Sequence, residues 1–181
     1  MRTVIVDAMQ AFLEQILQKA MTRLREHSEL VGLANVEEFT FRAFVMAEIM
    51  GACPTARCQA EWHKVDLLVQ RDGLNALVEF KFYLTRRTVL LDGSPSHWKG
   101  GASRKNLSEF QKCVEKLRNF ENSEIHRKFL VLVYEALYPK KSRYSFGMFY
   151  DQIKPDKQMT SVDAISHVME DRVTCKLIQI A

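Results

Sequence analysis

The chain has few of the residues and segments that mark specialised protein classes. It holds seven glycines and four prolines, and the glycines form no phosphate-binding loop. Its four cysteines lack the paired Cys-x-x-Cys spacing of a zinc site. No apolar run is long enough for a signal peptide or a bilayer-spanning helix. We therefore expect an intracellular, cytoplasmic protein with reduced thiols and no membrane association.

What remains is the composition of an ordinary globular protein. Of the 181 residues, 47% are hydrophobic and 27% are charged, and the formal net charge is +4. This length supports one domain with a sizeable core. A mildly basic balance is compatible with a polyanionic partner but does not identify one. We predict a single domain over residues 1–181, with a helical segment at about 7–50, a sheet core at about 57–135 and a C-terminal extension at about 140–181.

Two predicted strands near the middle of the chain carry charges among apolar residues. The first is Val65–Val69, which contains Asp66. The second is Ala76–Tyr83, which contains Glu79 and Lys81. An Asp-Gly pair between the two runs predicts a hairpin turn. The carboxylates of the two strands are therefore expected on neighbouring strands.

The spacing within the second strand decides which side chains meet. Alternate side chains of a strand share a face, so Glu79 and Lys81 point to one side and Phe80 to the other. Buried unpaired charges are costly, so the convergence of Glu79 and Lys81 with Asp66 requires an explanation. Two carboxylates that hold Mg²⁺ or Mn²⁺ beside a lysine form a site suited to phosphodiester hydrolysis.

The order Asp66, twelve intervening residues, then Glu79-Phe80-Lys81 resembles the PD-(D/E)xK nuclease superfamily. The resemblance implies an α/β (α+β) fold of the restriction-endonuclease-like type, a mixed central β-sheet flanked by helices. It also implies that Asp66, Glu79 and the backbone carbonyl of Phe80 bind the metal. Lys81 would orient or activate the attacking water.

The superfamily usually has a further acidic residue on an upstream helix, and Glu38 fits that place. It lies on the first turn of a predicted helix for which Asn35 is the expected N-cap. Two other roles stay open for Glu38, a capping box with Asn35 or an ion pair with Arg42. Glu37 and Glu48 are the remaining candidates to complete the site.

Basic residues follow the predicted hairpin. Arg86 and Arg87 come directly after it, and Lys105, Lys112 and Lys116 recur along the next predicted helix. All five are candidates for phosphate contacts, which position a nucleic acid without selecting its sequence. The alternative for the lysines is a solvated helix face.

The remaining elements complete a mixed sheet. We predict a helix at 7–27, strands at 57–62 and 173–180, and a helix at 161–169. A strand at 128–134 should run parallel to the strand of Glu79, with the helix between them as the crossover.

These patterns favour a metal-dependent endo- or exonuclease whose nucleic-acid partner we expect to be DNA. The sequence has no separate DNA-reading module, so three sources of specificity stay open: recognition of a nucleic-acid structure or end by the domain itself, a homodimer, or a partner protein. One alternative is a non-catalytic nuclease-fold domain that binds nucleic acid or a protein. Another is an unrelated α/β protein in which Lys81 pairs with a carboxylate or the charged face lies in solvent.

The resemblance to the PD-(D/E)xK superfamily covers about residues 35–135. It departs from the usual signature at Val65, where proline is common.

Overall fold

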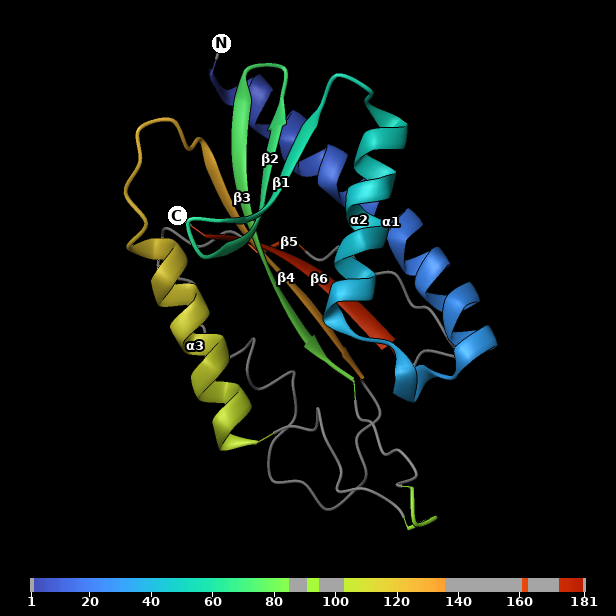
Figure 1. Cartoon of the computed structure of the whole chain (residues 1–181). Helices are drawn as coiled ribbons and strands as arrows, with labels where there is room; N and C mark the ends of the chain where they lie inside the picture. The colour runs from blue at the N-terminus through green and yellow to red at the C-terminus, as the bar shows by residue number, and fades with distance from the viewer. Residues whose placement is uncertain (1, 85–90, 95–102, 136–160, 163–172, 181) are drawn as a thin grey trace.

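The computed structural model of the chain describes residues 2–84, 91–94, 103–135, 161–162 and 173–180. Within these residues the fold is mixed α+β, with a mixed sheet between helices (Figure 1). The predicted fold class and the central sheet flanked by helices are confirmed at this level. The finer restriction-endonuclease-like type stays a prediction.

The elements follow one another as predicted over most of the chain. Their bounds are α1 (Arg2–Val31), the 3₁₀ turn η1 (Leu33–Asn35), α2 (Glu38–Ala52), β1 (Arg57–Trp62), β2 (Val65–Arg71), β3 (Leu74–Tyr83), α3 (Arg104–Arg118), β4 (Arg127–Glu135), β5 (Ser161–Val162) and β6 (Val173–Ile180).

The sheet has six strands in the order β1-β2-β3-β4-β6-β5. Every neighbouring pair is antiparallel except β3 and β4, which are parallel and joined through α3. Parallel neighbours require such a crossover because a tight turn cannot join them. The predicted parallel pairing and its crossover helix are therefore confirmed.

The hairpin between β2 and β3 also forms as the sequence predicts. Asp72 and Gly73 both have positive φ, 50° and 76°, and they join the paired residues Arg71 and Leu74. Two consecutive positive φ values are those of a type I′ turn, whose twist matches that of the strands it joins. This turn sets β2 and β3 in register with each other.

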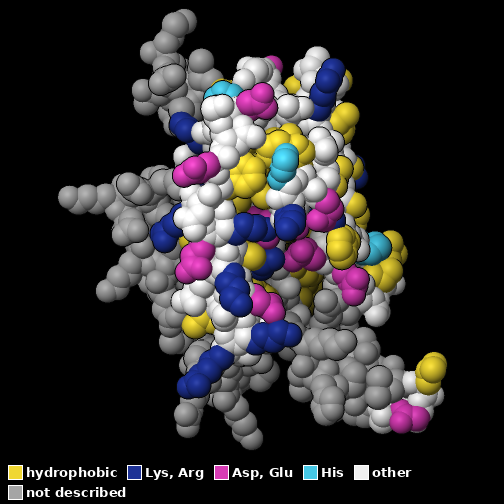
Figure 2. Space-filling model, turned by 60° about the vertical axis from the view of Figure 1, so that its left-hand side comes forward, with side chains coloured by type: hydrophobic (Ala, Val, Ile, Leu, Met, Phe, Trp, Pro, Cys, Tyr) yellow, Lys and Arg dark blue, Asp and Glu magenta, His cyan; other side chains and the backbone are white. Residues whose placement is uncertain are grey.

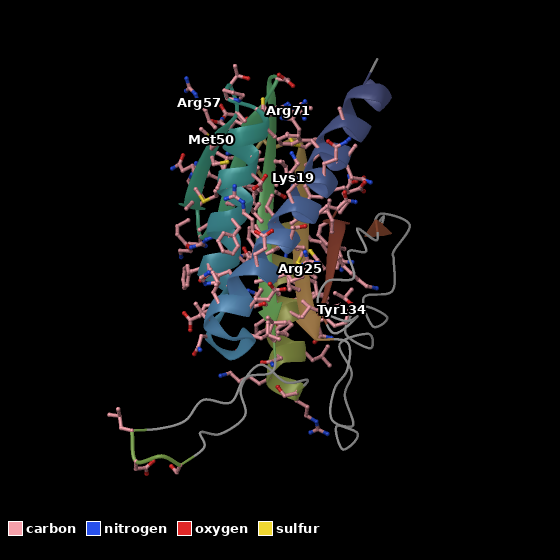
Figure 3. All side chains as sticks on the ribbon, turned by 90° about the vertical axis from the view of Figure 1, so that its right-hand side faces the viewer. Lys19, Arg25, Met50, Arg57, Arg71 and Tyr134 are labelled. Atoms are coloured by element: carbon pink, nitrogen blue, oxygen red, sulfur yellow. The ribbon has the colours of Figure 1, made fainter. Side chains whose placement is uncertain are left out.

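Helices α1 and α2 lie side by side over one face of the sheet (Figure 3). Phe41 of α2 is fully buried, and its ring meets that of Phe80 at a centroid distance of 6.2 Å. Helix α3 covers the opposite face with Phe110, Val114 and Leu117. Both faces of β3 are therefore covered, and its odd-numbered side chains are enclosed under α3.

Three predictions about the elements are wrong in detail. Helix α1 extends beyond 7–27 at both ends. Asn35 is not the N-cap of α2, because it ends the 3₁₀ turn and donates to the Val31 carbonyl, so Glu37 takes the capping position. Ser161 and Val162 form a strand instead of a helix, since they pair with β6, and 163–169 lie outside the described residues.

The sequence led us to expect no membrane-spanning helix and reduced cysteine thiols. No helix among the described residues is long and apolar enough to cross a membrane. All four cysteines are free thiols.

Candidate functional site

Side chains of β3 alternate between the two faces of the sheet, and this alternation places Glu79 on the face that α3 covers. Phe80 packs into the core under α1 and α2, and Glu79 faces α3 with 4% of its side chain exposed. One carboxylate oxygen of Glu79 lies 2.6 Å from Lys116 Nζ. The other accepts a bond from Cys113 Sγ at 3.5 Å and lies 3.7 Å from Lys81 Nζ. Glu79 is therefore not on a solvent-exposed face, which removes one of the alternatives left open by the sequence.

Asp66 lies where the pairing of β2 with β3 ends, one residue before the last pair, Leu67 with Val78. Its Oδ2 accepts the N–H of Phe80 at 2.7 Å, and its own N–H points to Glu79 Oε2 at 3.4 Å. The Asp66 carboxylate thus accepts the Phe80 N–H just beyond the point where the strand pairing ends. The two carboxylates meet as the sequence predicted, because both lie at this break in the pairing.

Arg42 of α2 forms an ion pair with Asp66. Its guanidinium lies 3.3 Å from Asp66 Oδ1 and 2.6 Å from Glu61 Oε1, and it stacks 4.7 Å from the ring centre of Phe39. The predicted pairing of Arg42 with Glu38 is absent from the ion pairs of the described residues. Sequence reasoning missed this role, although a lone arginine in an apolar helix is a signal for a buried carboxylate partner.

Burial and mutual repulsion act on the carboxylates together. Burial, with the charge of Glu79 next in size, raises the pKa of Asp66 above its ordinary value. Burial alone would lower the pKa of Lys81, but the fields of Cys113, Glu38, Glu79 and Asp66 outweigh it and raise that pKa. Asp66 is therefore harder to ionise than a free aspartate, and Lys81 is held as an ammonium.

Glu38 belongs to the same group. Burial raises the pKa of Glu38 to about 7, with Lys81 lowering it and the charges of Asp66 and Glu79 raising it further. Glu48, a second candidate to complete the site, forms an ion pair with Arg23 of α1, and 2.5 Å separates Arg23 Nε from Glu48 Oε1.

Glu37, the third candidate, is exposed at the start of α2. Glu38 is thus the acidic residue of α2 whose pKa is influenced by the charges of Asp66, Glu79 and Lys81.

The predicted basic stripe divides into residues with different surroundings. Lys116 enters the site, where it contacts Glu79 and also donates to the Lys64 carbonyl at 2.9 Å. Lys112 is exposed, and exposed Lys105 lies 3.8 Å from Glu109. Figure 2 shows lysine, arginine and acidic side chains gathered on this side of the molecule. Arg86 and Arg87, the other two candidates for phosphate contacts, lie outside the described residues.

The carboxylate oxygens of Asp66 and Glu79 are donors of the kind that bind a hard divalent cation whose remaining ligands are waters. No group of three or more histidine, cysteine or acidic side chains within the described ranges is arranged to hold a metal ion. Mg²⁺ commonly uses one or two carboxylates and completes its octahedron with waters and phosphate oxygens. Asp66 and Glu79 provide such a pair. In a strand the N–H and C=O of one residue point to the same side, so the Phe80 carbonyl faces the edge where Asp66 lies.

A scan against protein-family models and searches of curated proteins and solved structures found no match to this chain.

Proposed function

We propose that this protein is a metal-dependent nuclease of the PD-(D/E)xK type that hydrolyses phosphodiester bonds, with DNA as the expected substrate. The observation that carries the proposal is the meeting of Asp66 and Glu79 at the break between β2 and β3, with Lys81 beside them. Glu79 is buried and Asp66 is half-buried, and two such neighbouring carboxylates repel each other unless cations separate them. A bound divalent ion would relieve that repulsion.

Asp66, Glu79 and the Phe80 carbonyl would hold Mg²⁺ or Mn²⁺. The bound ion would polarise a phosphate oxygen and favour ionisation of a coordinated water. The chain itself contributes fixed charge at the reacting centre. Because its raised pKa keeps Lys81 protonated, Lys81 acts by orienting the water and offsetting charge on the phosphate. The carboxyl of Glu38, with a pKa of about 7, can accept or return a proton near neutral pH.

The test is single-turnover cleavage of labelled single-stranded, duplex and branched DNA, and of RNA, with Mg²⁺ or Mn²⁺. Lys81→Ala should cleave about 10²–10³ times more slowly, the usual loss for one preorganised electrostatic contact. Its affinity for Mn²⁺ and nucleic acid should stay near that of the wild type. Lys19→Ala, which removes an exposed lysine of α1, is the matched control and should cleave normally.

Lys81→Arg should restore little activity, because a forked guanidinium does not occupy the place of a compact ammonium. Cleavage by Lys81→Ala at the wild-type rate would show that the activity comes from another site or from a contaminant.

One observation favours a second candidate function, a nuclease-fold domain that binds nucleic acid or protein without cleavage. Arg42 and Lys116 already neutralise Asp66 and Glu79 at 3.3 and 2.6 Å, as in a structural network of buried charges. Calorimetry with Mn²⁺ on the wild type and Asp66→Ala tests for the metal. Binding that is lost in the variant, without cleavage of any substrate above, would favour this second function.

A further inference from the structure

Three aromatic side chains form a cluster beside the carboxylates. Trp62 ends β1, His63 lies in the turn between β1 and β2, and Phe120 follows the end of α3. The ring centres lie 4.3 Å apart for Trp62 and His63, 5.8 Å for Trp62 and Phe120, and 6.4 Å for His63 and Phe120. His63 is exposed and the other two are half-buried. The cluster therefore presents aromatic surface to solvent.

The turn that carries this cluster has an unfavourable backbone for its residues. His63 and Lys64 have φ of 47° and 66° and connect the paired residues Trp62 and Val65. Such a type I′ turn favours Asn-Gly, because a larger side chain is strained at positive φ. Glu61 has a positive φ of 55° as well. Non-glycine residues held at positive φ are concentrated at functional sites, which indicates a use for the imidazole and ammonium groups here.

A single lysine side chain links the cluster to the candidate site. Lys116 Nζ contacts the Lys64 carbonyl at 2.9 Å and Glu79 Oε2 at 2.6 Å. Phe120 lies just beyond the C-cap of α3, and its N–H donates to the Leu117 carbonyl at 3.3 Å. Figure 2 shows apolar side chains around a histidine, directly above a group of lysine, arginine and acidic side chains. A strand whose phosphate lies at the carboxylates would place an adjacent nucleotide near the rings.

We propose that Trp62, His63 and Phe120 form a stacking platform for an unpaired base of the substrate strand. The substrate is then a nucleic acid with a single-stranded segment next to the scissile phosphate, an inference that rests on the proposed function. Base–aromatic stacking is tolerant of sequence and depends on a free base face, which a base inside a closed duplex does not offer. Exposed Lys64 supplies positive charge for the backbone at the same turn.

Tryptophan fluorescence tests the platform directly. The sequence has two tryptophans, Trp62 and Trp98, so Trp98→Phe leaves Trp62 as the only reporter. Titration with an oligothymidylate in EDTA, where no cleavage occurs, should quench Trp62. An abasic strand with the same phosphates should quench weakly and bind about 5- to 150-fold less tightly for each stacked base lost. Equal quenching and affinity for the abasic strand would overturn the platform.

His63→Asn separates stacking from folding. Asparagine suits positive φ, so this variant should melt at a higher temperature than the wild type. It should nevertheless bind the single strand about 5-fold or more weakly, whereas His63→Tyr should bind it normally. A covalently closed, relaxed duplex circle, which has neither ends nor unpaired loops, should bind wild type and His63→Asn equally. Wild-type affinity of His63→Asn for the single strand, or a preference of the wild type for the duplex circle, would refute the proposal.

These measurements do not depend on catalysis. Base-dependent quenching without cleavage under any metal condition would reject the nuclease and retain the platform as a binding site. Cleavage of DNA without base-dependent quenching would retain the nuclease and reject the platform. Failure to bind any nucleic acid would reject both.

Discussion

Replacement of Glu38 by glutamine should stabilise the protein at neutral and alkaline pH. Burial, strengthened by Asp66 and Glu79 and opposed by Lys81, raises the pKa of Glu38 from 4.5 to about 7. The folded chain therefore keeps this proton to a higher pH than the unfolded chain does. As the pH rises from about 4.5 to about 7, ionisation favours the unfolded state and stability falls. At about 1.36 kcal/mol per pKa unit, the full loss above pH 7 is about 3 kcal/mol.

Glutamine has nearly the same shape as glutamate and has no proton to lose in this range. Glu38→Gln should therefore exceed the wild type by about 3 kcal/mol in free energy of unfolding at pH 8, and match it near pH 4. Urea unfolding in EDTA at several pH values between 4 and 8 measures the free energy of unfolding of the wild type and of Glu38→Gln. Glu26→Gln, the same change at an exposed position of α1, is the matched control.

A difference between Glu38→Gln and the wild type that does not change with pH would refute this reasoning. It would mean that Glu38 ionises freely in the folded protein and does not face the buried carboxylates. Saturating Mn²⁺ offers a further check. A cation bound beside Glu38 favours the ionised carboxylate, so the advantage of Glu38→Gln at pH 8 should shrink when the metal is present.

Three further predictions concern the metal and the core. Millimolar Mn²⁺ should raise the melting temperature of the wild type but not of Asp66→Ala, because a ligand of the folded state alone stabilises it; no shift in the wild type would argue against the site. Lys116→Met should bind Mn²⁺ more tightly in calorimetry, because Glu79 no longer has to leave an ion pair of 2.6 Å. Exposed Lys112→Met, one helical turn earlier, should bind as the wild type does, and weaker binding by Lys116→Met would contradict this competition. Phe41→Ala should lower the free energy of unfolding by about 3–5 kcal/mol, since a fully buried ring is removed; a loss under about 1 kcal/mol in urea unfolding would show that this core is loosely packed.

The local features of the candidate site could be predicted from the sequence. Strand periodicity of two fixed Glu79 and Lys81 on one face and Phe80 on the other, and the packing of Phe80 with α1 and α2 confirms it. The Asp72-Gly73 turn fixed the hairpin, so Asp66 had to lie on the strand beside Glu79. These relations depend on backbone geometry over a few residues, which sequence determines directly.

Only the tertiary structure decided which helical residues complete the site. Helical spacing assigned Lys116 to a basic face and left Glu38 open between a cap, an ion pair and the site. The docking of α2 and α3 on opposite sheet faces brought both toward Glu79 and turned Arg42 to Asp66. Periodicity gives the face of a helix but not the side chains it meets across the sheet. Those partners depend on how the helices pack, and the cost of burying an unpaired charge then selects the cation that pairs with each carboxylate.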